Sequence, residues 1–333
     1  MVRKCKFFNF TFTFALFAVL YTLLIKTALS PQIPTPENPL ILYSNQTRDD
    51  LRIVLKRSFS SALHSISIWM YAITDPLLLK TLTKKSTSNV HIHTTFDANG
   101  GTPKLPASLH PTPCHGRGLM HRKIVIIDSA TVFLGSANMT TSSLQTHDNL
   151  TLGVYHPGLA HFLESPHQNA FPFQIGNTSA LLWLLPDPTA LTAIQQHLAA
   201  ATHSIFVAMF TLTHPVLIDT LIEAHNRGVA VTVALDRYTA KGASKRAVKK
   251  LTTAGIPLYL SSNLPLLHHK WVYIDEERLI LGSTNWTDAA FCKNQDLLLF
   301  LHPLSQSMCK KMKAIMSALR TEGSTEYVLA SPS

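Results

Sequence analysis

HRKIVIIDSATVFLGSAN at residues 121–138 is matched further along the chain by HHKWVYIDEERLILGSTN at residues 268–285. In both stretches a histidine is followed by a lysine two residues later and by an aspartate five residues after the lysine, and both end in Gly-Ser-x-Asn. One such pattern can arise by chance in a chain with 17 histidines, but core packing does not generate two copies with identical spacing. The pair indicates a functional constellation that is built twice.

Each copy predicts a β-hairpin, because two apolar runs rich in β-branched and aromatic residues flank a short polar turn. A two-residue turn at Ser129-Ala130 would place Lys123 opposite Ser136 and His121 opposite Asn138. The second copy would pair the corresponding residues, Lys270 with Ser283 and His268 with Asn285. Since side chains alternate along a strand, each hairpin would gather an imidazole, an ammonium, a hydroxyl and an amide at one end.

The duplication extends beyond the motifs. Ala-Leu-His-Ser-Ile at 62–66 is echoed by Ala-Thr-His-Ser-Ile at 201–205, and further pairs such as Asp97 and Asp236 keep the same offset of 139 residues. The offset is 147 residues at the motifs, so the second half carries a net insertion of eight residues after Asp236. Two copies of one unit in a single chain should dock about a pseudo-two-fold axis, as the subunits of isologous dimers do.

The periodicity predicts an α/β fold made of two similar α/β/α sandwich halves, residues 31–165 and 166–333. The predicted elements before each hairpin are helices at 48–63 and 189–201, strands at 65–72 and 204–212, helices at 76–84 and 215–227, and strands at 90–96 and 229–235. A last amphipathic helix is predicted at 305–320.

Residues 1–30 predict a signal peptide or a membrane anchor. Basic residues at positions 3, 4 and 6 precede a nearly uninterrupted apolar run over 7–25, which is long enough to cross a bilayer as a helix. Pro31 directly after the acceptable cleavage sequence Ala28-x-Ser30 disfavours cleavage, so both interpretations stay open. In either case we expect the rest of the chain to be exported or membrane-anchored.

The two motifs resemble those of the phospholipase D superfamily, and the second copy is most similar to the compact bacterial nuclease and mitochondrial cardiolipin hydrolase branch. In the family pattern an asparagine and an acidic residue follow each motif. Asn294 and Asp296 match them in the second copy, whereas the first copy has His147 and Asn149 at these positions, with Asp148 between them. The resemblance implies cleavage or transfer of a phosphodiester through a covalent phosphohistidine, without a metal ion or other cofactor.

The residues fit that chemistry, because a phosphodiester needs neutralised oxygens, a nucleophile and an acid for the leaving group. The predicted catalytic residues are His121, Lys123, Asn138, His268, Lys270, Asn285 and Asp296. The predicted substrate-binding residues are Ser136, Ser283, Asn149 and Asn294. Asp128 and Asp275 lie beside the hairpin turns and are interpreted as structural, fixing the turn or bridging to a neighbour.

The resemblance favours the first-motif histidine as the nucleophile, with its acidic partner supplied from the other half. The resemblance therefore implies that Asp296 orients His121. It also implies that His268 is the general acid and that Asn149 or Asp148 supports it. A metal site at Cys114, His115 and His121 is the competing interpretation. The two lysines argue against it, because they would repel a cation.

A net charge of +10 favours an anionic partner. Lys241, Lys245, Arg246, Lys249 and Lys250 are predicted to share one helix before the second motif, either as a basic lip over the site or as a solvated face. The favoured partners are a phospholipid or other phosphodiester and a membrane surface, bound by a monomer that carries both motifs. The alternatives are a nuclease of the same fold, and a non-catalytic protein that binds anionic lipid or nucleic acid.

Overall fold

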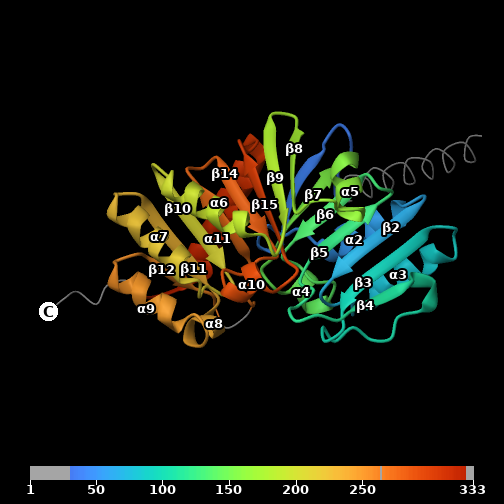
Figure 1. Cartoon of the computed structure of the whole chain (residues 1–333), viewed down its shortest axis with the longest axis horizontal. Helices are drawn as coiled ribbons and strands as arrows, with labels where there is room; N and C mark the ends of the chain where they lie inside the picture. The colour runs from blue at the N-terminus through green and yellow to red at the C-terminus, as the bar shows by residue number, and fades with distance from the viewer. Residues whose placement is uncertain (1–30, 263–264, 328–333) are drawn as a thin grey trace, which may run out of the picture. The chain divides into compact units, whose positions relative to one another are not determined.

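The computed structural model describes residues 31–262 and 265–327, and these form two mixed sheets with helices packed against them (Figure 1). The predicted signal peptide or anchor at 1–30 lies outside the described residues. Within the described ranges, no helix combines the length and the apolar character needed to cross a bilayer.

The first sheet has seven strands in the order β1-β7-β6-β5-β2-β3-β4, in which β2, β3 and β4 pair in parallel and the others are antiparallel. The strands are β1 (Leu40–Ser44), β2 (Ser65–Met70), β3 (His91–Asp97), β4 (Pro111–Cys114), β5 (Lys123–Ile127), β6 (Thr131–Gly135) and β7 (Leu150–Tyr155). The helices of this half are η1 (Asn45–Thr47), α2 (Leu51–Ser61), α3 (Pro76–Ser86), η2 (Ala107–Leu109), α4 (Thr141–Gln145) and α5 (Pro157–Glu164).

The second sheet has nine strands in the order β16-β12-β11-β10-β13-β14-β15-β9-β8, and its centre repeats the pairing of the first. The strands are β8 (Ala170–Ile175), β9 (Thr178–Leu184), β10 (Ser204–Met209), β11 (Ala230–Leu235), β12 (Leu258–Leu260), β13 (Lys270–Ile274), β14 (Arg278–Gly282), β15 (Leu297–His302) and β16 (Ser324–Tyr327). The helices are α6 (Pro188–Ala199), α7 (Pro215–Asn226), α8 (Arg237–Lys241), α9 (Lys245–Thr253), α10 (Asp288–Cys292) and α11 (Gln306–Glu322).

Apolar residues fill both faces of each sheet. One core lies between α2, α3 and the first sheet, and a matching core lies between α6, α7 and the second sheet. A third core joins the halves, because side chains of β6 and β7 pack with those of β14 and β15 and with α5 and α11. The predicted fold class, two α/β/α halves built on one plan, is confirmed.

The hairpin register differs from the prediction by one residue. Ile124 pairs with Leu134 in the first hairpin and Trp271 with Leu281 in the second, so the predicted pairing of each lysine with a serine is wrong. The reason is a three-residue turn, in which Asp128 and Ser129 adopt left-handed backbone conformations at φ 50° and 45°. Asp275 and Glu276 do the same in the second turn, at φ 51° and 57°.

The single basic helix predicted before the second motif is also wrong, since α8 and α9 divide it. Asp236 caps α8 by accepting hydrogen bonds from Tyr238 and Thr239, and this helix ends at Lys241 before Gly242. The hydroxyl of Ser244 then accepts a hydrogen bond from the backbone of Leu212 (3.0 Å), and the second helix, α9, starts at the next residue, Lys245.

Each Gly-Ser-x-Asn sequence requires its glycine, because the backbone of a neighbouring strand passes too close for a Cβ atom. A Cβ at Gly135 would lie 2.3 Å from the Leu150 carbonyl oxygen, and one at Gly282 would lie 2.2 Å from the Leu297 carbonyl oxygen. This approach lets the serine that follows each glycine contact the strand beyond the hairpin, β7 or β15.

We expect Gly135→Ala to lower the free energy of unfolding by about 1–3 kcal/mol, because backbone atoms must move to admit the Cβ. Gly116→Ala is the matched control, since a Cβ there would meet nothing nearer than 3.4 Å. Thermal or denaturant unfolding of the two variants measures the difference. Equal stability of both variants and the unchanged chain would contradict this account of the glycine.

Candidate active site

The two motif histidines meet across the junction of the halves, because each is tied by its backbone to the opposite half. The His121 amide donates to the Gln295 carbonyl (2.9 Å), and the His268 amide donates to the Asp148 carbonyl (2.9 Å). Gln295 and Asp148 occupy equivalent positions just before β15 and β7. The site therefore consists of two reciprocal crossings, and neither half forms it alone.

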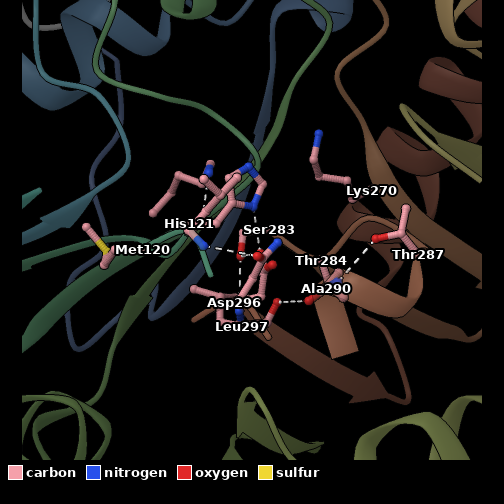
Figure 2. A network of polar contacts seen from close by, with 12 residues as sticks. Met120, His121, Lys270, Ser283, Thr284, Thr287, Ala290, Asp296 and Leu297 are labelled. Carbon is pink, nitrogen blue, oxygen red and sulfur yellow. Dashed lines mark hydrogen bonds and ion pairs between the residues drawn. The ribbon is translucent and has the colours of Figure 1, made fainter. Parts of the chain in front are cut away.

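In the first of these contacts between the halves, the side chain of His121 meets a carboxylate. Nδ1 of His121 lies 2.7 Å from Oδ1 of Asp296, and the Ser283 hydroxyl donates to the same oxygen at 2.5 Å (Figure 2). The backbone of Leu297 donates to the Ser283 hydroxyl oxygen (3.0 Å) and so fixes the serine. With Nδ1 donating to the carboxylate, the Nε2 lone pair of His121 is the one left to react.

The second crossing repeats this geometry with an amide in place of the carboxylate. Nδ1 of His268 lies 3.0 Å from Oδ1 of Asn149, and the Ser136 hydroxyl donates to that oxygen at 2.8 Å. The amide group of Asn149 donates to the Ser143 carbonyl (2.7 Å), which orients its oxygen toward His268. Because that oxygen only accepts, Nδ1 of His268 carries the hydrogen and Nε2 carries the lone pair, as in His121.

Each lysine is held beside its histidine in an aromatic setting. Nζ of Lys123 donates to the His121 carbonyl (2.7 Å), and Nζ of Lys270 donates to the His268 carbonyl (2.8 Å). Each ammonium also lies over an aromatic ring, Lys123 at 5.4 Å from the centroid of Tyr71 and Lys270 at 4.9 Å from that of Phe210. Both lysines are almost fully buried, so two cationic groups are concentrated at the centre of the site.

The two histidines differ in charge environment. Burial, followed by the charge of Lys123, lowers the pKa of His121, while the Asp296 carboxylate opposes the shift. Burial, followed by the charges of Lys270 and Lys123, holds the pKa of His268 well below its usual range. Asn149 carries no charge that could oppose this shift. The free site therefore favours a neutral His268 more strongly than a neutral His121.

The lysines are poised to bind an anion. Burial lowers the pKa of Lys123 to about 7, against the opposing charges of Asp296 and Asp97. Burial, followed by the charge of Lys123, also holds the pKa of Lys270 well below its usual range. Burial works to raise the pKa of Asp296, but His121, Lys123 and Ser283 outweigh it, so the carboxylate stays ionised. An added anion between the lysines would relieve their mutual repulsion.

The structure separates the predicted phosphate-contacting residues into two groups, the asparagines of the motifs and the serines. The side-chain oxygens of Asn138 and Asn285 are buried and have no hydrogen-bond partner among the described residues. Since an amide oxygen only accepts, the part of each side chain that could bind a phosphate is its NH2 group. Ser136 and Ser283 instead direct their hydroxyl hydrogens at Asn149 and Asp296. A hydroxyl has one hydrogen to donate, so this arrangement makes the serines positioning residues and does not support their prediction as phosphate donors.

Asn149 and Asn294, the other two predicted substrate contacts, are engaged elsewhere. The oxygen and the amide group of Asn149 are used by His268 and Ser143. The side-chain oxygen of Asn294 accepts a hydrogen bond from the backbone of Leu119 (3.0 Å) in the loop that leads to His121. Both residues therefore position the motifs in this structure.

Asp128 and Asp275 lie at the far ends of their strands from the lysines. The Asp128 carboxylate accepts hydrogen bonds from the backbones of Leu63, His64 and Ser65, and Asp275 receives the matching three from residues 202–204. Burial works to raise the pKa of each carboxyl, but these hydrogen bonds outweigh it and hold the pKa below its usual value. The two aspartates fasten each hairpin turn to the loop that enters β2 or β10.

Asp148 is not the partner of His268. It lines a separate pocket with Tyr259, Leu319 and Glu322, and burial followed by the charge of Glu322 raises its pKa to about 7. Side chains alternate along an extended segment, so Asn149 faces His268 while Asp148 faces away. Asn149, rather than Asp148, is therefore the residue that supports His268.

Sequence reasoning missed two pairs of residues that shape the site. Tyr71 and Phe210 pack against His121 and His268, with ring centroids 5.6 and 5.1 Å apart. Asp97 accepts a hydrogen bond from the backbone of Met120 (2.7 Å), and Asp236 does the same for Leu267. All four residues keep the 139-residue offset of the duplication, so the repetition itself was the signal that could have marked them.

No group of three or more histidine, cysteine, aspartate or glutamate side chains suited to a metal ion occurs in residues 31–262 and 265–327. Cys114 instead lies near Gln295, whose amide group is 3.6 Å from its sulfur.

Comparison with known proteins identifies the family. Residues 55–168 and 194–320 match a family model described as "Cardiolipin synthase, PLD-like domain". The mitochondrial cardiolipin hydrolase of Mus musculus is 32% identical over 146 residues, which cover 39% of this chain and 65% of that protein. The phospholipase D of Rickettsia typhi is 24% identical over 161 residues, covering 45% of this chain and 78% of that protein.

Among solved structures, the phosphatidylserine synthase of Haemophilus influenzae matches over 89% of both chains with a TM-score of 0.71 at 12% identity, which shows a shared fold. The chain spans about half to two thirds of the length of several curated relatives, for example 48% of the mitochondrial cardiolipin hydrolase of Chlamydomonas reinhardtii. A family match over both halves places this protein in the phospholipase D superfamily.

The buried lysines predict that anion binding depends on pH. Diethyl phosphate keeps one negative charge throughout the neutral range, and it binds best when Lys123 is protonated. Because the pKa of Lys123 is about 7 in the free site, binding above pH 7 requires proton uptake, and the dissociation constant should rise up to about tenfold per pH unit.

An NMR titration of diethyl phosphate between pH 6 and pH 9 measures this dependence. Lys123→Met should bind more weakly at pH 6 and show a flatter pH profile. A dissociation constant that stays the same across this range in the unchanged chain would contradict the account.

Proposed function

We propose that this protein is a phospholipase D type phosphodiesterase that cleaves the phosphodiester of phospholipids through a covalent phosphohistidine. The observation that carries the proposal is the crossed arrangement, in which two buried histidines are each bound through Nδ1 to the opposite half and each is followed by a buried lysine. The coarser assignment, membership of a phosphodiesterase family, rests on the family match.

His121 is proposed as the nucleophile. Its Nε2 attacks phosphorus, forming a P–N bond as the P–O bond to the leaving alkoxide breaks. The imidazole then becomes a cation, and the ionised Asp296 at 2.7 Å from Nδ1 stabilises that charge. An asparagine cannot supply this stabilisation, which is why His268 is the weaker candidate for the nucleophile.

His268 is proposed as the general acid and then the general base. Its protonated Nε2 gives a proton to the leaving alkoxide, and in the second step the neutral ring removes a proton from the attacking water or alcohol as the P–N bond breaks. The pKa of His268 lies well below its usual range in the free site, so the anionic substrate must raise it for the ring to be protonated. Backing by a neutral amide keeps the ring a strong acid once it is charged.

Lys123 and Lys270 are proposed to neutralise the non-bridging oxygens, together with the amides of Asn138 and Asn285. Charge that builds on these oxygens in the transition state then meets donors that are already in place. The buried setting strengthens each interaction, because few water molecules screen it.

Phospholipid is favoured as the substrate for two reasons. Several relatives are named cardiolipin hydrolase or phospholipase D, and the apolar run at 7–25 suggests export or anchoring at a membrane. We extend the proposal to a protein that acts as a monomer at or beyond that membrane. A nuclease of the same fold is the second candidate, since the catalytic groups do not select the leaving group.

A non-catalytic binding protein is the third candidate, because Asn149 stands where the other half has Asp296. Retention of both histidines and both lysines, with hydrogen bonds in place, disfavours loss of activity.

The test offers the purified full chain two substrates in EDTA: vesicles of phosphatidylcholine or cardiolipin, and single-stranded DNA. We expect release of headgroup or phosphatidic acid from the vesicles, and we expect it to persist in EDTA, since lysines neutralise the phosphate. His121→Ala should lose at least about 10³-fold in turnover. Asp148→Asn is the matched control and should retain turnover, since its side chain faces away from His268.

DNA cleavage without lipid cleavage would favour the nuclease. Binding of either substrate without cleavage would favour the non-catalytic candidate. Activity that EDTA abolishes and zinc restores would overturn the proposed chemistry.

A further inference from the structure

Large apolar side chains are exposed mainly at the end of the sheets that carries the site. In the part of the chain that the structure describes, four such residues stand out: Leu63, Leu119, Val216 and Tyr238. Three of them lie in segments that are hydrogen-bonded to residues beside the site, whereas Leu63 is bonded to Asp128 at the opposite end of β5. Isolated exposed apolar residues need no explanation, but a set gathered around a site indicates an interaction surface.

Leu119 projects from the first half. It is 39% exposed and lies two residues before His121 in a loop held against the second half. Its backbone amide donates to the side chain of Asn294, and its carbonyl accepts from Gln295. Gly118 lies so close to the Lys293 carbonyl that a Cβ there would be 2.1 Å from the oxygen. Leu119 is therefore presented to solvent by a fixed loop at the rim of the site.

Tyr238 projects from the second half. It is 62% exposed in α8, and the next residue, Thr239, donates its hydroxyl to the Phe210 carbonyl. Phe210 packs against His268 and Lys270, so α8 borders the site directly. Val216, also 39% exposed, lies two residues after His214, whose backbone amide donates to the carbonyl of Trp286 just after the second motif (2.9 Å).

Exposed cations lie close in the chain to Leu119 and to Tyr238. Ser244, which precedes α9, is bonded to the Leu212 backbone, so the first residues of α9 lie near the same end as α8 (Figure 1). Lys241, Lys245 and Arg246 are exposed and have no ion-pair partner among the described residues, whereas Lys250 pairs with Asp219 at 2.8 Å. Arg117, two residues before Leu119, and Lys293, whose carbonyl lies against Gly118, are also exposed.

We propose that Leu119, Tyr238 and the cations of α8 and α9 form a docking face for an anionic phospholipid membrane. Leu119 and Tyr238 insert among the headgroups on opposite sides of the site, and the cations bind the negative surface. This proposal rests on the proposed function, because the docking face would place the site at the depth of the phosphodiesters in the membrane surface. A membrane is proposed over nucleic acid because Leu119 offers no ring on which a base could stack, which leaves Tyr238 as the one ring of the pair.

Vesicle sedimentation tests the docking face with the full chain and phosphatidylcholine vesicles, with and without phosphatidylglycerol. Leu119→Ser combined with Tyr238→Ser should weaken binding to the anionic vesicles by roughly tenfold or more. Lys241→Glu combined with Lys245→Glu and Arg246→Glu should remove the preference for phosphatidylglycerol. Turnover of bis(p-nitrophenyl) phosphate, a soluble diester, should stay within about twofold of the unchanged chain in all variants.

Leu63→Ser is the matched control. Leu63 is 72% exposed, and its backbone is bound to Asp128 at the end of β5 far from Lys123, so the change should leave vesicle binding unaltered. Unchanged vesicle binding in the Leu119 and Tyr238 double variant would overturn the docking face. So would a loss confined to single-stranded DNA binding, which would assign the surface to nucleic acid.

The two proposals fail in different ways. If the unchanged chain binds anionic vesicles through this face but cleaves no lipid, the docking face stands and the proposed lipid substrate does not. If it cleaves phospholipid while the variants bind vesicles normally, the function stands and the face does not.

Discussion

The hydrogen bond from each motif histidine to a residue of the opposite half is the interaction on which the rest of the structure depends. It joins His121 to Asp296 and His268 to Asn149, so each half holds one histidine and the group that orients the other. The glycine before each serine, the three-residue hairpin turns and the shared apolar core all serve to hold these two short contacts in register. A disturbance in either half therefore reaches both histidines.

The two histidines have similar hydrogen-bond geometry but unequal charge environments, and the roles proposed for them rest on that difference. Both rings carry the hydrogen on Nδ1 and receive the same serine-backed support, but only His121 faces an ionised carboxylate. A carboxylate stabilises the cation of a phosphohistidine intermediate, and a neutral amide keeps its partner ring acidic. In the proposed mechanism, the single difference between Asp296 and Asn149 at equivalent positions therefore distinguishes the nucleophile from the acid.

Duplication explains how much of this was predictable from the sequence. Both halves, their main helices and strands, and the gathering of histidine, lysine and asparagine follow from spacing that is repeated at fixed offsets. The hairpin register was not predictable, because left-handed residues at Asp128 and Asp275 lengthen each turn by one residue. The serine roles also depend on that register, and the division of the basic segment into α8 and α9 depends on a tertiary contact of Ser244.

The most direct test of the central claim is to find which histidine carries the phosphoryl group. The unchanged chain and the His268→Asn variant are reacted with a p-nitrophenyl phosphodiester, whose good leaving group needs little acid catalysis. The reactions are quenched under alkaline conditions, and the adduct is located by mass spectrometry. We expect the adduct on His121 in both proteins, with accumulation in the variant. A phosphoryl group on His268 in the unchanged chain would contradict the assignment of His121 as the nucleophile.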